Sequence, residues 1–231
     1  NRLLTDEISD FYFVTEQSGL DHLKAHGVDD KKVFFVGNTM IDSLVEFEPQ
    51  VQESDILKQY QLTPQGYVLM TMHRPSNVDE KEGLETLIAI IKSITNNLKL
   101  VFPIHPRTIA KLKQFGLWEQ IEHLEGLIFS EPLDYFSFQK LTADCKFVVT
   151  DSGGIQEETT YRQIPCLTLR NNTERPSTVT IGSNVLVPYT IKDVEFYINQ
   201  IMTGTFKKGA VPPLWDGKST ERILEVLKQV L

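Results

Sequence analysis

The clearest chemical signal in the sequence is the run Ser152-Gly153-Gly154, which lies between an apolar segment and a helical pattern. Residues 147–150 are typical of a buried strand, and residues 155–162 are predicted to form a helix. Glycines let a ligand approach the backbone closely, and the free N–H groups at a helix start favour an anion. The run could therefore bind a diphosphate. A tight glycine turn without a ligand is the alternative.

Three further polar segments each follow a predicted strand and carry histidine or arginine. They are His73-Arg74 after residues 67–72, His105-Pro106-Arg107 after residues 100–104, and the segment 170–177 after residues 166–169. Imidazole titrates near neutral pH, and guanidinium matches the geometry of phosphate. Ligands of open α/β sheets bind beyond the carboxyl ends of the strands, so these segments could line one crevice. A solvated surface loop is the alternative for each of them.

Acidic and aromatic residues near these segments could contact a nucleoside. Glu157 and Glu158 fall in the first turns of the predicted helix 155–162, where a carboxylate could accept hydrogen bonds from ribose hydroxyls. The segment 134–138 begins another predicted helix and carries three aromatic rings, one of which could cover a planar base. The alternatives are acids that complement the helix dipole and aromatics that belong to the core.

Strand and helix patterns alternate along the chain. The predicted strands are residues 11–15, 33–36, 67–72, 100–104, 127–129, 147–150, 166–169 and 185–187. The predicted helices are residues 17–26, 39–47, 79–96, 108–115, 134–142, 155–162, 191–202 and 219–230. This alternation predicts βαβ units, and therefore an α/β fold with a Rossmann-type parallel sheet that carries helices on both faces.

The composition changes between Glu48 and Gly66, where two prolines and several glutamines interrupt the periodic pattern. We interpret residues 1–48 as the C-terminal remnant of a second Rossmann-type domain and residues 49–65 as a linker. Residues 66–231 are then a complete α/β domain, whose final helix is able to pack back on the first region.

Composition excludes several classes of protein. The chain of 231 residues has a formal net charge of −8, which argues against a nucleic-acid-binding protein. Its apolar runs are shorter than the ~20 residues of a membrane span, and no secretory leader is evident, so we expect a cytoplasmic protein that does not contact membranes. We interpret the histidines as scattered and the two cysteines as reduced core thiols, which predicts no metal site. The common P-loop and dinucleotide motifs are missing, so we expect no cofactor.

Taken in order, these segments resemble the non-hydrolysing UDP-N-acetylglucosamine 2-epimerases of bacteria and archaea. The matching stretches are Asn1-Arg2-x-Leu4-Thr5-Asp6, Val36-Gly37-Asn38-Thr39-x-Ile41-Asp42, His73-Arg74-x-x-Asn77, His105-Pro106, the segment 151–158 and Asn172-Thr173-Glu174-Arg175-Pro176. The resemblance implies a GT-B-like architecture of two Rossmann-type domains, of which residues 66–231 would bind UDP. It also implies that UDP-N-acetylglucosamine is converted to UDP-N-acetylmannosamine by elimination and re-addition of UDP, without cofactor or metal.

The resemblance also implies roles for individual residues. His73 would be the active-site histidine beside the sugar–phosphate bond, and Arg74 and His105 would line a second, regulatory UDP-sugar site. The implied substrate contacts are Ser152, Gly153 and Gly154 to the diphosphate, Glu158 to the ribose, Phe138 and the backbone near Leu133 to the uracil, and Arg175 and Arg2 as further substrate-binding residues. Ser76 replaces a glutamate that many members carry, which puts the regulatory role of that position in doubt.

The resemblance leaves several functional readings open. The family carboxylates assigned to proton transfer would precede Asn1, so we expect this chain to bind UDP but to be catalytically incomplete. Its parent would be a homodimer in surface-polysaccharide precursor synthesis, with UDP-sugars as ligands. The alternatives are a C2 epimerase of a UDP-diacetamido-uronic acid, a hydrolysing epimerase, a non-catalytic UDP-binding module and a glycosyltransferase of the same architecture.

Overall fold

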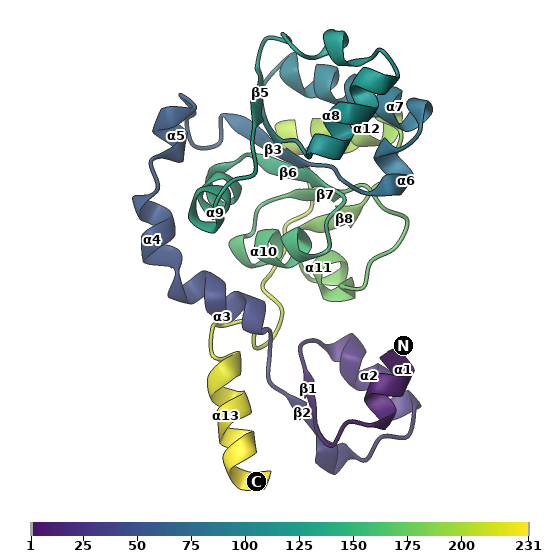
Figure 1. The fold of residues 1–231 in the computed structure, drawn as a ribbon. Helices are drawn as coiled ribbons and strands as arrows, with labels where there is room; N and C mark the ends of the chain where they lie inside the picture. The colour runs from purple at the N-terminus through teal and green to yellow at the C-terminus, as the bar shows by residue number, and fades with distance from the viewer. Residues whose placement is uncertain (1, 231) are drawn as a thin grey trace. The chain divides into compact units, whose positions relative to one another are not determined.

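The computed structural model describes the backbone of residues 2–230 and the side chains of residues 4–230. It divides the chain into two compact units. The first combines the chain up to Glu48 with the chain from Val211 onward, and the second is Pro49–Ala210. The purple and yellow ends of the ribbon in Figure 1 therefore belong to the first unit, and the colours between them to the second.

The second unit contains a six-stranded parallel sheet. Its strands are β3 (Tyr67–Thr71), β4 (Lys99–Pro103), β5 (Leu127–Ser130), β6 (Phe147–Thr150), β7 (Cys166–Thr168) and β8 (Asn184–Leu186). They lie in the order β5-β4-β3-β6-β7-β8, with parallel pairing throughout. The direction of strand addition reverses between β3 and β6, which is the switch point of a Rossmann-type sheet. The predicted parallel sheet is confirmed, with strand ends shifted by a residue or two.

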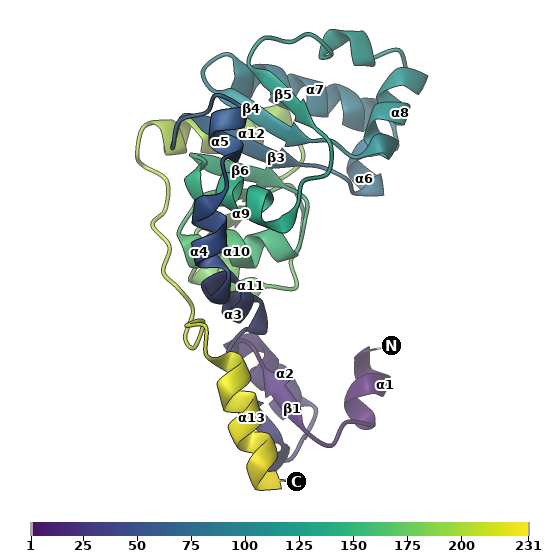
Figure 2. The same cartoon turned by 60° about the vertical axis from the view of Figure 1, so that its left-hand side comes forward.

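Side chains that alternate along the strands form a core on each face of this sheet. Val68 and Met70 belong to one buried cluster, and Tyr67 and Leu69 belong to the other. The first cluster includes residues of α7 (Lys81–Thr95), α8 (Pro106–Gln114) and α12 (Ile191–Met202), and the second includes residues of α5 (Ile56–Gln59), α9 (Tyr135–Asp144) and α10 (Gly154–Arg162). Helices therefore cover both faces, as the views in Figures 1 and 2 show.

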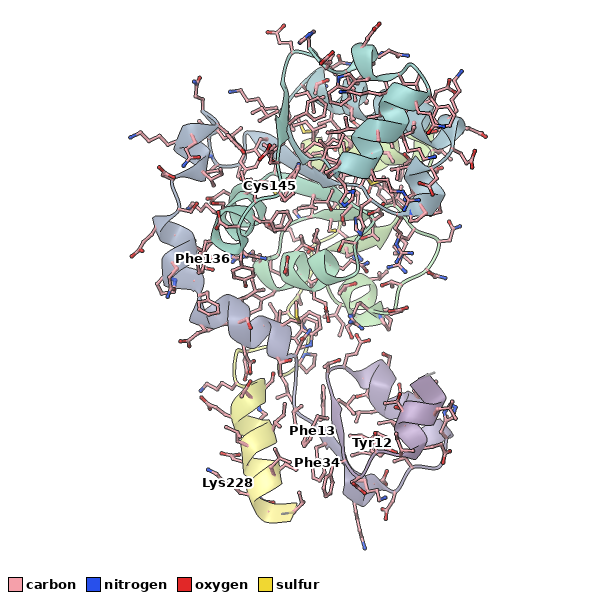
Figure 3. The ribbon with its side chains drawn as sticks, in the orientation of Figure 1. Tyr12, Phe13, Phe34, Phe136, Cys145 and Lys228 are labelled. Carbon is pink, nitrogen blue, oxygen red and sulfur yellow. The ribbon has the colours of Figure 1, made fainter. Side chains whose placement is uncertain are left out.

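Both cysteines lie in the second core cluster as free, fully buried thiols. Cys145 is labelled in Figure 3, and Cys166 lies on β7. Burial raises the pKa of the Cys166 thiol to about 11, so the protonated form is favoured. The predicted reduced core thiols are confirmed.

The segment after β3 contains a short helix that the sequence pattern did not predict. Pro75 occupies the first turn of α6 (Pro75–Val78). Proline fits there because it lacks only an N–H that has no partner in a first turn. The long helix α7 begins at Lys81 rather than at the expected residue 79. A Cβ atom on Gly83 would lie 2.3 Å from the Asn77 carbonyl oxygen, so this glycine is needed for the close approach of α7 to α6.

The first unit contains a two-stranded parallel sheet, in which β1 (Tyr12–Val14) pairs with β2 (Val33–Phe35). The rings of Phe13 and Phe34, labelled in Figure 3, lie 5.9 Å apart between centroids. The helices of this unit are α1 (Arg2–Glu7), α2 (Gln17–Ala25), α3 (Thr39–Glu46) and α13 (Ser219–Val230). The strand–helix–strand order matches the expected pattern for residues 11–47.

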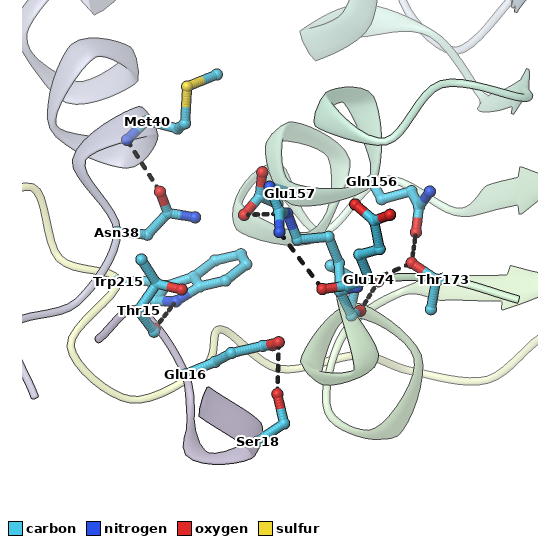
Figure 4. A network of polar contacts seen from close by, with 12 residues as sticks. Thr15, Glu16, Ser18, Asn38, Met40, Gln156, Glu157, Thr173, Glu174 and Trp215 are labelled. Atoms are coloured by element: carbon cyan, nitrogen blue, oxygen red, sulfur yellow. Dashed lines mark hydrogen bonds and ion pairs between the residues drawn. The ribbon is translucent and has the colours of Figure 1, made fainter. Parts of the chain in front are cut away.

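The final helix is held within the first unit by hydrogen bonds to residues far away in sequence. The Asp42 carboxylate accepts hydrogen bonds from the backbone N–H groups of Ser219 (3.0 Å) and Thr220 (2.6 Å), at the start of α13. Trp215 is 2% exposed, and its indole N–H donates to the Thr15 carbonyl at 3.0 Å (Figure 4). Residues from Val211 onward therefore group with residues 1–48, whereas we had assigned them to the second domain.

The segment expected to be a linker is helical. It carries α4 (Glu48–Glu53) and α5, and Val51 and Ile56 on these helices are buried. Lys140 on α9 donates to the Gln52 side chain at 2.7 Å, and residues from Pro49 onward group with the second unit. These helices are too short for a periodic pattern to show in the sequence.

Within residues 2–230, no helix has the length and apolar character needed to cross a bilayer.

A single hydroxyl links the first strand of the large sheet to α9. Tyr67 is fully buried, and its hydroxyl donates to the Leu141 carbonyl at 2.7 Å. We expect Tyr67→Phe to lower the free energy of unfolding by about 1–3 kcal/mol, because the carbonyl loses its donor in a buried place. The half-buried Tyr60, whose hydroxyl has no recorded partner among the described residues, offers the matched control Tyr60→Phe. That change should cost less than about 0.5 kcal/mol in urea unfolding, and equal losses for both variants would contradict the assignment.

Candidate functional site

The carboxyl ends of β3 and β6 meet at the switch point of the sheet. The hydroxyls of Thr71 and Thr150, at the last positions of these strands, lie 2.6 Å apart. The Asp151 N–H then donates to the Thr71 carbonyl at 3.3 Å. The loops that follow the two strands therefore start side by side, which brings His73-Arg74 close to Asp151-Ser152.

The buried carboxylate of Asp151 organises the loop after β3. Its side chain is fully buried, and it accepts hydrogen bonds from the backbone N–H groups of His73 (3.1 Å) and Arg74 (2.9 Å) and from the Asn77 amide (3.2 Å). The His73 Nδ1 lies 3.1 Å from Oδ1 of the same carboxylate, while the His73 side chain is 55% exposed. The Arg74 Nε donates to the Asp151 carbonyl at 3.0 Å. Asp151 was not among the site residues predicted from the sequence, although it is the first residue after a buried strand.

The Ser152-Gly153-Gly154 turn is open on its ligand side. The Ser152 N–H donates to the Thr150 hydroxyl at 2.9 Å, and α10 starts at Gly154 without a side-chain cap. A Cβ atom on Gly154 would meet nothing within 4 Å, and one on Gly153 would meet only Nη1 of Arg170, at 3.9 Å. The first N–H groups of a helix have no intrahelical acceptor, so this uncapped start can receive an anion.

Arg170 adds a second cationic group beside this turn. Its Nε is buried and has no hydrogen-bond partner among the described residues. Burial, together with the nearby charge of Arg74, lowers the pKa of the Arg170 guanidinium. Two close guanidinium groups repel each other, and an anion between them would remove that repulsion. We had predicted that the segment 170–177 is rich in donors, but we had assigned only Arg175 within it.

A cavity of about 360 Å³ opens between these two arginines. Apart from Arg74 and Arg170, its lining includes the amide side chains of Asn77, Asn171 and Asn172, so the site is rich in hydrogen-bond donors. A second cavity of about 800 Å³ lies near Gly66 and Lys99, at the amino ends of β3 and β4. Because ligands of such sheets bind at the carboxyl ends, we assign the first cavity to the candidate site. It is lined by the loops after β3 and β7, and the Ser152 turn is not part of its lining.

A buried amide connects the Ser152 turn to the loop that follows β7. The Gln156 side chain is fully buried and donates to the Ser152 carbonyl at 2.9 Å. Its Oε1 accepts hydrogen bonds from the Thr173 hydroxyl at 2.7 Å, as Figure 4 shows, and from the Asn184 amide at 3.1 Å. Gln156 therefore fixes the turn relative to residues 170–177. Nothing in the sequence indicates this role, because Gln156 is one position of a predicted helix, next to two glutamates.

Arg175 is oriented by a carboxylate from α10. Its Nε lies 3.0 Å from Oε1 of Glu157, whose side chain is 5% exposed, and Arg175 directly precedes α11 (Pro176–Thr180). The Arg175 side chain itself is 42% exposed, so part of the guanidinium remains open to solvent. The Glu157 carboxylate, labelled in Figure 4, thus holds this guanidinium rather than facing a ribose.

The residues expected at the nucleoside lie on α9, on α10 and in the segment just before α9. Glu158 is 9% exposed, and its Oε2 has no partner among the described residues. Burial raises the pKa of the Glu158 carboxyl, against the opposing effects of the Gln139 hydrogen bond and the Arg162 charge. Leu133 and Phe138 are half-buried and pack against the core cluster of the same sheet face. The structure therefore brings Leu133, Phe138 and Glu158 to one side of the sheet.

The remaining expected site residues are not part of this cluster of contacts. His105 precedes α8, and its Nδ1 accepts from the Arg107 N–H at 3.1 Å. Arg107 in turn pairs with Asp79 at 2.6 Å. The first contact is local to the start of α8, whereas the second joins α8 to the C-cap of α6. No direct contact of His105 with Arg74 is recorded among the described residues. The side chain of Arg2 lies outside the described residues.

One expectation about the histidines was wrong. His22 and His26 are not scattered, because they lie four residues apart, His22 on α2 and His26 at its C-cap, with ring centroids 4.4 Å apart. The His26 Nδ1 is 2.9 Å from the His22 carbonyl oxygen. No group of three or more potential metal-ligating side chains occurs in the part of the chain that the structure describes.

The buried Glu158 predicts a pH-dependent stability. A raised pKa in the folded state means that the folded chain binds the proton more tightly than the unfolded chain, whose ordinary value is 4.5. The contribution of Glu158 to stability is therefore present at low pH and decreases as the pH rises above 4.5. We expect Glu158→Gln, which is neutral at every pH, to be more stable than the parent chain at pH ~8 but not at pH ~4.

Urea unfolding of both chains across this pH range measures the difference. The exposed Glu85 provides the control Glu85→Gln, for which we expect little difference at any pH. A parent chain that is at least as stable as Glu158→Gln at pH ~8 would contradict the effect of burial on this carboxyl.

Comparison with known proteins identifies the family. Residues 1–228 match the family model described as UDP-N-acetylglucosamine 2-epimerase. The UDP-N-acetylglucosamine 2-epimerase of Methanocaldococcus jannaschii is 35% identical over 236 residues, which cover 98% of this chain and 63% of that relative. A UDP-2,3-diacetamido-2,3-dideoxy-D-glucuronate 2-epimerase of Pseudomonas aeruginosa is 33% identical over 190 residues, covering 81% of this chain and 51% of that relative.

Solved structures give the same result. The crystal structure of the M. jannaschii UDP-GlcNAc 2-epimerase in complex with UDP-GlcNAc and UDP has a TM-score of 0.84 and 34% identity to this chain. The match covers 99% of this chain and 64% of that one, so this chain spans less than two thirds of that relative's length. The expected α/β, GT-B-like fold class is confirmed by this similarity. The chain belongs to the UDP-N-acetylglucosamine 2-epimerase family.

Proposed function

We propose that this chain binds the UDP part of a UDP-sugar and serves the C2 epimerisation of UDP-N-acetylglucosamine to UDP-N-acetylmannosamine. The observation that carries the proposal is the open Ser152-Gly153-Gly154 turn beside the unpartnered Nε of Arg170, at the switch point of the sheet. The chain as a whole is acidic, so this local concentration of donors is specific to the site.

The diphosphate is the part of the ligand that this arrangement fits best. In the proposal, the N–H groups of Gly153 and Gly154 and the Ser152 hydroxyl bind its oxygens at the start of α10. Arg170 lies next to the same turn, and an anion there would give its Nε an acceptor. Arg175, held by Glu157, is the further phosphate contact that we propose.

The nucleoside contacts follow from the α9 and α10 residues. We propose that Glu158 accepts hydrogen bonds from the ribose hydroxyls, because one of its buried oxygens has no partner among the described residues. Phe138 and the backbone near Leu133 would bind the uracil from the same side of the sheet. A ribose contact to Glu158 would also stabilise the ionised carboxylate, which burial disfavours.

The proposed reaction breaks the bond between C1 of the sugar and the diphosphate while a proton leaves C2. The resulting 2-acetamidoglucal then takes back UDP at C1 and a proton at C2, and the proton adds to the face that gives C2 the opposite configuration. Negative charge develops on the departing diphosphate, and donors fixed in advance around it lower the barrier. The contribution of this chain is therefore the stabilisation of UDP as leaving group, with His73 next to the bond that breaks.

Relatives support the same function. The M. jannaschii structure contains UDP-GlcNAc and UDP, and the family model is named for this activity. The P. aeruginosa relative favours one alternative, C2 epimerisation of a UDP-diacetamido-uronic acid. Three expectations remain parts of the proposal, namely a regulatory UDP-sugar near Arg74 and His105, a homodimer, and a cytoplasmic role in surface-polysaccharide precursor synthesis.

Binding of UDP by this chain tests the proposed site. We expect Ser152→Ala and Arg170→Gln each to raise the dissociation constant of UDP roughly 10- to 100-fold, because each removes a hydrogen bond to a charged group worth about 1.5–3 kcal/mol. Isothermal titration calorimetry measures the constants. The exposed Lys99, the first residue of β4, supplies the control Lys99→Gln, which removes a positive charge at the amino ends of the strands, opposite the site. If the two site variants bind UDP as tightly as this control, our placement of the diphosphate is wrong.

Turnover of the full-length protein in D₂O tests the reaction. Elimination and re-addition exchange the C2 hydrogen with solvent, so we expect UDP-N-acetylmannosamine with deuterium at C2. We expect kcat/KM for UDP-N-acetylglucosamine to exceed that for the diacetamido-uronate sugar by at least about tenfold, equivalent to ~1.4 kcal/mol of discrimination. The reverse preference would establish the alternative substrate. UDP binding without any exchange would favour a non-catalytic binding module.

A further inference from the structure

The contact between Asp151 and His73 determines which nitrogen of the histidine ring carries a proton. Oδ1 of Asp151 lies 3.1 Å from Nδ1 of His73. The aspartate side chain is fully buried, whereas the histidine side chain is 55% exposed. One edge of the ring thus faces a fixed group inside the protein, and the remainder of the ring faces outward.

All recorded partners of this carboxylate are hydrogen-bond donors. Oδ2 accepts from the backbone N–H groups of His73 (3.1 Å) and Arg74 (2.9 Å) and from the Asn77 amide (3.2 Å). Oδ1 accepts from the His73 N–H at 3.3 Å. Such a set of partners suits an ionised carboxylate, which can only accept. The hydrogen of the contact with the His73 ring must therefore belong to Nδ1.

The arginine closest to this pair does not compete for the ring contact. The Arg74 Nε donates to the Asp151 carbonyl oxygen rather than to its carboxylate. Within the described residues, no partner is recorded for Nε2 of His73, which lies on the far side of the ring from Nδ1. The carboxylate therefore orients the ring through one nitrogen and leaves the other free.

We propose that Asp151 is a positioning residue that holds His73 as the Nδ1–H tautomer and leaves Nε2 as the ring nitrogen that contacts ligand. The ligand contact rests on the proposed function, whereas the tautomer does not. A neutral His73 would accept a hydrogen bond at Nε2. A protonated His73 would donate from Nε2 to a diphosphate oxygen, and the Asp151 carboxylate would compensate the charge of the ring.

Nuclear magnetic resonance of the ¹⁵N-labelled chain tests the tautomer directly. Long-range ¹H–¹⁵N spectra distinguish a protonated ring nitrogen from an unprotonated one, and His73→Gln identifies the signals. At pH ~8, above the ordinary titration range of imidazole, we expect Nδ1 of His73 to be protonated and Nε2 to be unprotonated.

His105 is an internal control in the same spectrum. Its Nδ1 accepts from the Arg107 N–H at 3.1 Å, so it should show the opposite tautomer, with the proton on Nε2. If His73 shows the same tautomer as His105, the proposal is overturned. This comparison needs no Asp151 variant, so it holds even if such a variant does not fold.

The substitution Asp151→Asn tests whether the carboxylate is the cause. Oδ2 of Asp151 accepts hydrogen bonds from three donors, so the oxygen of an asparagine side chain should keep the Oδ2 position. Its NH₂ group would then take the Oδ1 position and face the His73 ring. The ring must then accept at Nδ1, so we expect His73 to change to the Nε2–H tautomer while the His105 signals stay the same. An unchanged His73 tautomer in a folded Asp151→Asn chain would refute the role of Asp151.

Adding UDP separates this proposal from the proposed function. If both hold, UDP shifts the Nε2 signal of His73 more than its Nδ1 signal. A larger shift at Nδ1 would contradict the assignment of Nε2 as the ligand-facing nitrogen. Absence of any spectral change with UDP would count against the proposed function, and the tautomer would still be decided by the spectrum without ligand.

Discussion

The buried carboxylate of Asp151 is the interaction on which the candidate site depends. A buried charge is costly unless donors surround it, and here the donors come mainly from the loop after β3. That loop therefore cannot leave the carboxylate without exposing or unpairing a charge. The consequence is that His73 and Arg74 are fixed beside the Ser152 turn, although the two segments belong to different strand–loop connections. The same constraint would keep the site formed before any ligand binds.

The site also contains polar atoms that the protein itself does not satisfy. The buried Nε of Arg170 and Oε2 of Glu158 are among the buried side-chain atoms without a hydrogen-bond partner in the described residues. One is a donor next to the Ser152 turn, and the other is an acceptor on the helix that begins there, so our proposal gives each of them a ligand partner. Gln156, in contrast, has partners at both Nε2 and Oε1, namely Ser152, Thr173 and Asn184, which suits a structural support of the turn.

Patterns among near neighbours in the sequence predicted most of the fold. The buried strands of the large sheet are short apolar runs, and α7 shows its apolar face in the spacing of its leucines and isoleucines. The short helices α4, α5, α6 and α11 were missed because four to six residues are too few to establish a period. The prediction that residues 49–65 form a linker was wrong for the same reason. Val51 and Ile56 are buried, but the residues around them show no extended apolar periodicity.

The sequence by itself determined the family, the parallel α/β class and the position of the Ser152-Gly153-Gly154 turn, because each depends on residues that are adjacent or one helical turn apart. Only the tertiary structure decided that Asp151 binds a loop 78 residues away, that Arg170 lies beside Gly153, and that α13 groups with residues 1–48. These facts depend on strand order and on which chain segments return to the same place. Local preferences cannot specify such contacts, because the free energy that selects them comes from burying the whole sheet at once.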